Sequence, residues 1–448
     1  MRVENIFSKL NYQRLGCAKL ALLGLTLTIV SAAHAQTATT FEEAISPDFS
    51  YAQAVQQTSD GGYVLGAVVS SPPYTGLVAK FDSSGNLQWQ KQYPSSIGSS
   101  GVYALSQTSD GGYVWGGYIQ DSSSYAEYAI AVKLDSSGNI QWQKTYGGVE
   151  YVTDIRQTAD GGYVVAGITP PSPYEIVQAW IAKLDSSGNV KWQKALGSSQ
   201  SAMANAVIQT SDGGYALAGL AKSNVLVAKF DSSGNVKWQN VYTSPSGLGL
   251  GYSIVQTSDG GYMVGGYDND SPFLASALKL NSSGQVNWAK TYNVSGAASK
   301  FFSVRQTSDG GYVFAGQFYT GLGYYYGYNA WMVKTDSSGN VQWQKAYGNP
   351  NYAASFQGLG LTSDGGFVAG GYTLEYNGQN EVYVVKTDSG GNLNNCADVQ
   401  GTSLIVASLP ESASAAKLTV TAPAYKAGTG TLSASSTSFT LATECSGN

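Results

Sequence analysis

Residues 157–167 read QTADGGYVVAG, and residues 183–192 read KLDSSGNVKW. The first phrase recurs, with small variations, seven times along the 448-residue chain, and a version of the second follows each copy. An internal repeat with a period of roughly 20–50 residues indicates a repeat architecture, so it is considered before the individual elements. The aspartates of the first phrase are Asp60, Asp110, Asp160, Asp212, Asp259, Asp309 and Asp364, spaced 47 to 55 residues apart.

Each repeat contains four short β-type segments and two tight-turn signals. In the sixth copy the segments are 302–306, 311–317, 330–335 and 341–347. The Asp-Gly and Ser-Gly-Asn steps between them favour hairpin turns, because glycine adopts the positive φ that such turns require. Four strands in about 50 residues are typical of a propeller blade. The sequence therefore predicts an all-β fold, a seven-bladed β-propeller of four-stranded blades.

The seventh repeat predicts how the ring closes. Six repeats end in a tryptophan on the fourth strand, but the seventh has Asn395 at that position. Phe41 precedes the first repeat by the spacing that a tryptophan would have, so we expect residues 37–45 to form the fourth strand of the last blade. Such closure avoids leaving unpaired strand edges between the first and last blades. The alternative is that residues 393–395 begin an outer strand of their own.

The N-terminal residues 1–35 predict an export signal. Four basic residues precede an apolar run at 20–30, and residues 31–35 read SAAHA, a small-residue cleavage pattern. The run of about 11 residues is too short to span a bilayer, and no later stretch is long and apolar enough. We therefore expect an exported protein without a membrane span that is periplasmic, cell-surface or extracellular.

The remaining chain divides into a propeller at 36–396 and a C-terminal tail at 397–448. The tail is rich in Ser, Thr and Ala and predicts a small β or Ser/Thr-rich appendage. In an oxidising compartment a Cys396–Cys445 disulfide is expected to tie it back to the ring, closing a loop of about 50 residues. A disordered stalk and two free buried thiols are the alternatives.

Charge and composition exclude several classes of function. The chain has 24 basic and 29 acidic residues, and residues 36–448 keep 20 and 28 of them. Because the one histidine, His34, lies in the export signal, catalysis or metal binding by histidine is excluded beyond it. The irregular loops are predominantly acidic, which disfavours nucleic acid, since phosphate binding needs a basic patch.

The repeats resemble those of a secreted bacterial β-propeller repeat family. The resemblance is carried by residues 146–148, 157–167 and 182–189 and covers residues 41–395. It implies a propeller and an exported or surface-associated protein, and it implies no reaction. The Asp-x-x-Gly-x-x-x-Trp element is also similar to the tryptophan-docking element of quinoprotein propellers, which we interpret as convergent packing.

The candidate binding face is the one opposite the tight turns. In an antiparallel four-stranded blade both repeated turns lie on one face, and the irregular loops lie on the other. Function is carried disproportionately by variable loops on a rigid scaffold. Tyrosines in these loops can stack on sugars or anchor a protein partner, although tyrosine is also an ordinary packing residue. The candidate ligand-binding residues are Tyr125, Tyr128, Tyr174, Tyr324, Tyr325, Tyr326, Tyr328 and Tyr376.

Three sets of carboxylates are candidate sites. Asp268, Asn269 and Asp270 cluster three oxygen ligands and form a candidate calcium site, with a solvated loop as the commoner interpretation. The repeated Asp-Ser-Ser-Gly-Asn turns carry one carboxylate each and are better explained by an aspartate that caps its own turn. No cofactor is expected apart from this calcium. Glu375 and Glu381 are candidate acids for glycoside hydrolysis.

These observations favour an exported, non-enzymatic β-propeller that binds through an acidic, tyrosine-rich loop face. Its predicted partner is a glycan, a cationic partner or another envelope or extracellular protein. The alternatives are a carbohydrate-active hydrolase or lyase that uses loop carboxylates, and a purely structural envelope component. The sequence does not predict the oligomeric state.

Overall fold

The computed structural model describes residues 40–45, 50–70, 72–169, 176–197, 201–243, 249–268, 272–294, 297–319, 327–348, 352–374 and 380–393. Beyond residue 393 it describes the backbone of seven short strands. All the regular elements in these parts of the chain are β-strands, as the repeats predict. The predicted export signal at 1–35 lies outside the described residues.

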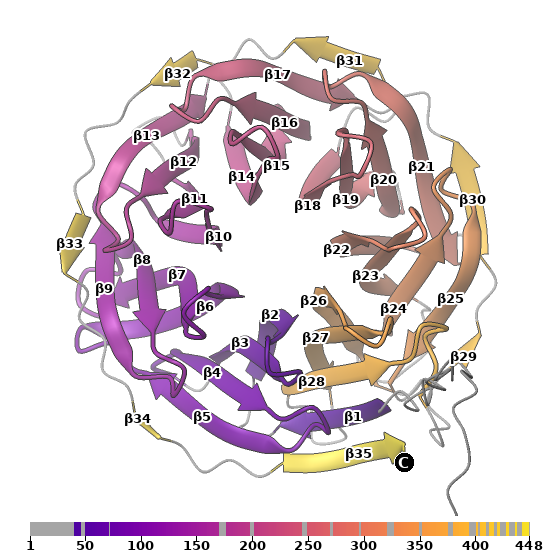
Figure 1. Ribbon diagram of the computed structural model, residues 1–448, viewed down its shortest axis with the longest axis horizontal. Helices are drawn as coiled ribbons and strands as arrows, with labels where there is room; N and C mark the ends of the chain where they lie inside the picture. Colours follow the sequence, from indigo (N-terminus) through magenta and orange to yellow (C-terminus); the bar gives the residue numbers. More distant parts are fainter. Residues whose placement is uncertain are drawn as a thin grey trace, which may run out of the picture. The chain divides into compact units, whose positions relative to one another are not determined.

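The compact unit Ala38–Asn448 is a ring of seven antiparallel sheets, seen down its axis in Figure 1. Blade 1 contains β2 (Ser50–Gln57), β3 (Tyr63–Val69), β4 (Thr75–Phe81) and β5 (Leu87–Tyr93). Blade 2 contains β6 (Gly98–Gln107), β7 (Tyr113–Asp121), β8 (Glu127–Leu134) and β9 (Ile140–Tyr146). Blade 3 contains β10 (Tyr151–Gln157), β11 (Tyr163–Ile168), β12 (Ala179–Leu184) and β13 (Val190–Gly197).

The next blades repeat this order from the innermost strand outward. Blade 4 contains β14 (Ala202–Gln209), β15 (Tyr215–Ala221), β16 (Asn224–Phe230) and β17 (Val236–Thr243). Blade 5 contains β18 (Gly249–Gln256), β19 (Tyr262–Asp268), β20 (Leu274–Leu280) and β21 (Val286–Val294). Blade 6 contains β22 (Ser299–Gln306), β23 (Tyr312–Tyr319), β24 (Tyr328–Thr335) and β25 (Val341–Tyr347).

The N-terminal strand closes the ring, as predicted. Blade 7 contains β26 (Ala354–Leu361), β27 (Phe367–Leu374), β28 (Asn380–Thr387) and then β1 (Thr40–Ile45), which is antiparallel to β28. Phe41 lies opposite Lys386, the register that Trp89 and Lys80 have in blade 1. Phe41 therefore occupies the place of the missing tryptophan.

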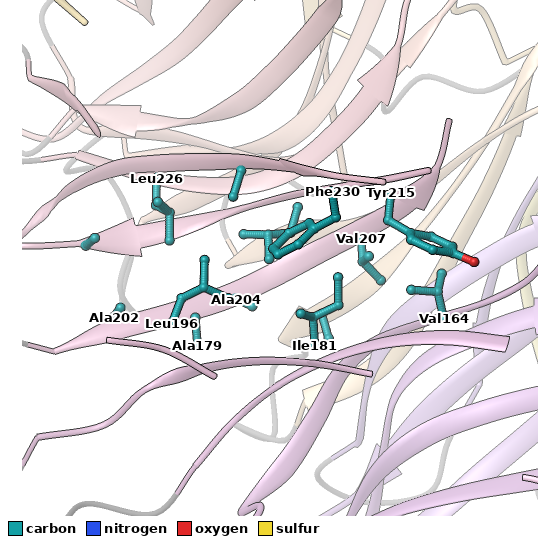
Figure 2. Packing of buried hydrophobic residues seen from close by; sticks show 14 of the residues in the cluster. Val164, Ala179, Ile181, Leu196, Ala202, Ala204, Val207, Tyr215, Leu226 and Phe230 are labelled. Carbon is teal, nitrogen blue, oxygen red and sulfur yellow. The ribbon is translucent and has the colours of Figure 1, made fainter. Parts of the chain in front are cut away.

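Buried aliphatic side chains fill the space between neighbouring blades. The two middle strands of each blade are almost entirely buried, whereas the fourth strand has a mixture of half-buried, buried and exposed residues. Between blades 3 and 4, Ile181 and Leu196 on one sheet face Leu226 and Phe230 on the other (Figure 2). Burial of such side chains contributes about 1.5–3 kcal/mol each, which explains why the repeats keep apolar residues there.

The repeated tryptophan docks each blade on the next. Its ring covers the positive-φ glycine of the next blade's Ser-Gly-Asn turn, where a Cβ added to Gly138 would come within 2.8 Å of the Trp89 ring. The ring also packs against the tyrosine after the next Asp-Gly-Gly, as in the contact of 5.8 Å between the ring centroids of Trp89 and Tyr113. The contact recurs at the seam, where Phe41 takes the role of tryptophan.

In every blade a buried lysine on the third strand forms an ion pair with the aspartate of the first turn. In blade 1, Lys80 Nζ lies 2.9 Å from Asp60 Oδ2 and donates a hydrogen bond to the carbonyl of Phe81. All seven copies make this ion pair at 2.7 to 2.9 Å. Partial burial opposes ionisation of Asp60, but hydrogen bonds from Thr58, Lys80 and Gly62 outweigh it and lower the pKa to about 2. The repeated lysine and this aspartate thus have a structural role.

The two glycines of Asp-Gly-Gly give a testable contrast. Gly111 has φ +80° with open space around it, whereas a Cβ on Gly112 would lie 2.3 Å from the carbonyl oxygen of Leu134 and 2.6 Å from Lys133 Nζ. We expect Gly111→Ala to cost about 1–2 kcal/mol, the strain of a left-handed backbone. Gly112→Ala should cost on the order of 3 kcal/mol or more, because it displaces backbone and the buried lysine. Urea unfolding of both variants checks this, and equal costs would contradict it.

The C-terminal segment is β-structured, but it is not a compact appendage. Its strands, which we call the C-terminal belt, add a fifth antiparallel strand to the outer edge of every blade (Figure 1). The belt visits blades 6, 5, 4, 3, 2, 1 and 7 in that order. It consists of β29 (Gln400–Gly401), β30 (Leu404–Ser408), β31 (Ser412–Ala415), β32 (Thr419–Thr421), β33 (Ala427–Thr429), β34 (Ser435–Ser436) and β35 (Leu441–Gly447).

The belt differs from the predicted appendage for a physical reason. Four of the belt strands have only two or three residues, too few to form a stable sheet by themselves, but each blade offers the unpaired outer edge of its fourth strand. The last belt strand, β35, pairs with β1, so both ends of the propeller unit meet in blade 7. Cys445 lies in β35 opposite Glu42. Cys396 lies outside the described residues, so the disulfide and the domain boundary at 396–397 remain predictions.

Candidate functional site

The repeated turns interlock with one another on one face of the ring. In six of the seven copies the glutamine of the first phrase accepts a hydrogen bond from the previous blade's turn, as when Ser59 N donates to Gln107 Oε1 at 2.8 Å. Ser363 N of blade 7 donates to Gln57 Oε1 of blade 1 in the same way. Aspartates of the second phrase cap their own turns, as predicted, with Asp82 Oδ1 accepting from Ser84 N and Asn86 N. Residues engaged in this way are structural, which leaves the opposite, irregular face for binding.

The irregular face carries a groove between blades 2 and 3. Its volume is about 530 Å³, and we call it the tyrosine–glutamate groove. It includes two of the predicted tyrosines and two loop glutamates. Its lining consists of Tyr125, Ala126, Glu127, Tyr128, Gly148, Val149 and Glu150.

Tyr125 is displayed by a tight local structure. Asp121 Oδ1 accepts hydrogen bonds from Ser123 N and Ser124 N, and the Tyr125 amide donates to the carbonyl of Asp121. Tyr125 itself has φ +57° and is 76 % exposed. A bulky residue in the left-handed region costs conformational energy, and such residues concentrate at binding sites. The loop thus holds an aromatic ring in solvent at an energetic cost.

The opposite wall of the groove is fixed by backbone hydrogen bonds. The Ala129 amide of β8 donates to the carbonyl of Val149, and the Glu150 amide donates to the carbonyl of Ile168 in blade 3. Residues 148–150 therefore belong to both blades and cannot move independently of them. A rigid groove of this kind binds with little loss of conformational entropy.

The two glutamates of the groove carry charge that the described residues do not neutralise. Burial raises the pKa of Glu127, and burial together with the charge of Glu127 raises the pKa of Glu150. Glu127 Oε1 accepts one hydrogen bond from Gln120 Nε2 at 3.1 Å. Among the described residues neither glutamate forms an ion pair. The groove is therefore a partly desolvated anionic surface beside two aromatic rings.

The other predicted tyrosines are not brought into this groove. Tyr328 is half-buried in blade 6, with its ring centroid 5.3 Å from that of Tyr319. Five predicted ligand-binding residues lie outside the described residues and remain predictions: Tyr174, Tyr324, Tyr325, Tyr326 and Tyr376.

The candidate calcium site is described only in part. Asp268 is buried at the end of β19, where its backbone pairs with Gly249 and Leu274. Asn269 and Asp270 lie outside the described residues. In the part of the chain that the structure describes, no three His, Cys, Asp or Glu residues gather as metal ligands. Of the two candidate hydrolytic acids, Glu381 is buried opposite Thr373 in blade 7, and Glu375 is not described.

Sequence reasoning missed a second site, the central channel. The innermost strand of every blade contributes to a cavity of about 110 Å³. Each of these strands has a register shift, for example between Val152 and Asp154, and the extra residue lines the channel. Because a bulge breaks the alternation of period two, the sequence pattern gave no sign of which residues face inward. The extra residues are Gln53, Tyr103, Thr153, Asn205, Tyr252, Phe302 and Gln357.

Comparison with known families adds one match. Residues 74–266 match the family model described as outer membrane protein assembly factor BamB. Together with the seven blades, this supports a β-propeller repeat family of that general type. The match covers blades 2 to 4 and parts of blades 1 and 5, which is less than half of the chain.

The chain is similar to a protein of unknown function from Dyadobacter fermentans DSM 18053, with 11% identity and a TM-score of 0.46 over 77% of this chain and 97% of that one. No curated protein matches the chain. Within the described residues, no helix has the length and apolarity needed to cross a bilayer.

Proposed function

We propose that this chain is an exported, non-enzymatic binding protein whose tyrosine–glutamate groove takes a cationic segment of an envelope protein. The observation that carries the proposal is a pair of partly buried glutamates that form no ion pair among the described residues, beside a tyrosine that is 76 % exposed. The export pattern of residues 1–35 supports a location outside the cytoplasm.

The electrostatics of the groove favour a cation over a neutral ligand. Both glutamates have a raised pKa, which means that their ionised forms are disfavoured in the free protein. A lysine or arginine placed between them would relieve the mutual repulsion. The faces of Tyr125 and Tyr128 would add a cation–π contribution of about 0.5–1 kcal/mol.

A protein partner is favoured over a free glycan by two considerations. The family model that matches residues 74–266 is named for an assembly factor of outer membrane proteins, which by its name acts on other proteins. Charged lysine or arginine side chains are common in proteins, whereas most neutral glycans would leave the glutamate charges uncompensated. A glycan that binds here is the principal competing result.

The test is a calorimetric titration with a pentalysine peptide. Replacing both carboxylates by Glu127→Gln and Glu150→Gln should weaken binding about tenfold, which corresponds to about 1.4 kcal/mol. Tyr125→Ala should weaken it about three- to fivefold, whereas Tyr125→Phe keeps the ring and should bind nearly as well. Because the pKa values of the glutamates are raised, protonation should abolish binding at a higher pH than for exposed glutamates.

The matched control removes the same charge from the opposite face. Asp82→Asn with Asp135→Asn lowers the negative charge by two in the repeated turns. The chain itself shows that such turns tolerate the change, because Asn281 Oδ1 accepts the same hydrogen bonds from Ser283 N and Gln285 N in blade 5. Equal losses in the two double variants would mean non-specific attraction to an acidic protein. If the protein binds glycans on an array and does not bind pentalysine, the ligand of the groove is a sugar and not a cationic protein segment.

A further inference from the structure

The central channel combines features of a second binding site. Figure 1 shows the innermost strands β2, β6, β10, β14, β18, β22 and β26 arranged around the axis of the ring. Side chains from all seven line a cavity of about 110 Å³. This volume is smaller than the roughly 150 Å³ of an engineered cavity that takes benzene, so it suits a molecule of only a few heavy atoms.

Both arginines of residues 36–448 line this cavity. The chain contains four arginines, and the other two, Arg2 and Arg14, lie in the predicted export signal. Arg156 and Arg305 occupy the same repeat position, one residue before the glutamine of the first phrase, on β10 and β22. The other blades place no charged residue at this position, which is occupied by Gln56, Ser106, Ile208, Val255 and Gly360.

Arg156 is held in place by a single acid. Its Nε lies 3.0 Å from Asp154 Oδ1, and Asp154 Oδ2 accepts a hydrogen bond from the Val207 amide of blade 4. The ion pair does not have hydrogen-bond geometry, so Arg156 Nε is a buried donor without a hydrogen-bond acceptor among the described residues.

No acid forms an ion pair with Arg305 among the described residues. Arg305 Nη1 donates to the carbonyl of Val304 at 2.7 Å and to Ser303 Oγ at 3.3 Å. Burial and the positive charge of Arg156 lower the pKa of Arg305 to about 10, while Asp154 opposes the shift. Arg305 therefore remains charged at neutral pH, and the two guanidinium groups that line the cavity repel each other. One carboxylate against two guanidinium groups leaves the described lining with a net positive charge.

Aromatic side chains line the same cavity beside these charges. Tyr103, Tyr252 and Phe302 are extra residues of the bulges and belong to blades 2, 5 and 6. The rings of Tyr252 and Phe302 are in edge contact, with 4.9 Å between centroids. A ligand in the cavity would thus contact both the positively charged guanidinium groups and the aromatic rings.

We propose that the channel binds a short-chain organic acid whose carboxylate lies between Arg156 and Arg305 and whose apolar part lies against Tyr252 and Phe302. Guanidinium groups match carboxylates in planar, two-point geometry, and a carboxylate would satisfy the free donor of Arg156 and neutralise Arg305. This site is independent of the tyrosine–glutamate groove.

Saturation-transfer NMR with propionate and its neutral analogue propionamide tests the proposal on the full chain. Propionate should give a signal and propionamide should not, because the two differ in charge and hardly in shape. Arg305→Gln should weaken propionate binding at least tenfold. Lys237→Gln removes the same charge from an exposed position on β17 and should leave binding unchanged.

Three outcomes would overturn the proposal: equal binding of propionate and propionamide, no binding of either, or equal affinity of wild type and the folded Arg305→Gln variant. If Arg305→Gln does not fold, Arg305→Lys serves as the second variant. It keeps the positive charge but lacks the two parallel N–H donors of the guanidinium, so it should bind propionate more weakly than wild type. A pentapeptide with a free C-terminus should not compete with propionate. If it does compete, and if amidation of its C-terminal carboxylate removes the competition, the site binds a protein C-terminus instead. Pentalysine binding should be unaffected in every channel variant.

Discussion

A chain that ends at Leu393 is expected to melt on the order of 10 °C lower than the full chain and to self-associate. The truncation removes the C-terminal belt, which supplies a fifth strand to all seven blades. Each net hydrogen bond contributes about 0.5–1.5 kcal/mol, so seven strand pairings sum to several kcal/mol. For a domain of this size each kcal/mol corresponds to about 2–4 °C or less. Thermal unfolding and light scattering measure the two effects.

Self-association follows from the edges that the truncation exposes. Every fourth strand would present unpaired backbone groups, and such edges pair readily with other chains. In blade 7 the effect is greatest, because β35 covers β1 along its whole length from Thr40 to Ile45. A chain ending at Ser436 loses only β35 and should show an intermediate loss of stability.

The full-length double variant Cys396→Ser with Cys445→Ser is the matched control. It retains every belt strand but cannot form the predicted disulfide, so it separates strand pairing from covalent closure. A truncated chain that stays monomeric and melts within about 2 °C of the full chain would mean that the belt neither stabilises the propeller nor protects its strand edges.

Phe41→Ala is expected to cost about 3–5 kcal/mol, the usual effect of emptying a buried aromatic position. Phe41 is 1 % exposed, its ring centroid lies 5.4 Å from that of Tyr63, and it covers Gly85 of the blade 1 turn. Its loss weakens the seam between the last and first blades, where the ring is closed by a strand from the other end of the propeller.

Chemical denaturation measures this cost, with Phe41→Leu as control. Leucine keeps most of the apolar volume and should cost roughly 1–2 kcal/mol. A Phe41→Ala cost no larger than that of Phe41→Leu would mean that the seam does not depend on this side chain.

The blades and their closure could be predicted because each repeat carries its own docking contacts. A tryptophan, a turn glycine and the tyrosine after Asp-Gly-Gly recur at fixed spacing, so the substitution of Phe41 for tryptophan could be recognised from spacing alone. The partner of the repeated lysine was less evident. Lys80 pairs with Asp60, twenty residues earlier, because the antiparallel strands β2, β3 and β4 bring the turn between β2 and β3 beside β4.

The belt and the channel could not be predicted for different reasons. Six of the seven belt strands pair with strand edges more than a hundred residues away in sequence, and segments as short as Ser435–Ser436 carry no periodic signal of their own. The channel depends on a bulge in each innermost strand, which turns Tyr252 and Phe302 toward the axis. One signal was present in the sequence, since arginine occurs at the same position in two repeats and nowhere else beyond residue 35.

We propose that the interlocked turns support the ring while the irregular face binds a partner. Hydrogen–deuterium exchange of the full chain with and without pentalysine tests this most directly, because it maps the footprint on every strand and loop. We expect slower exchange in residues 121–128 and 148–151, and no change in the turns around Asp82 and Asp135. Protection that appears in those turns, or equally on both faces, would contradict it.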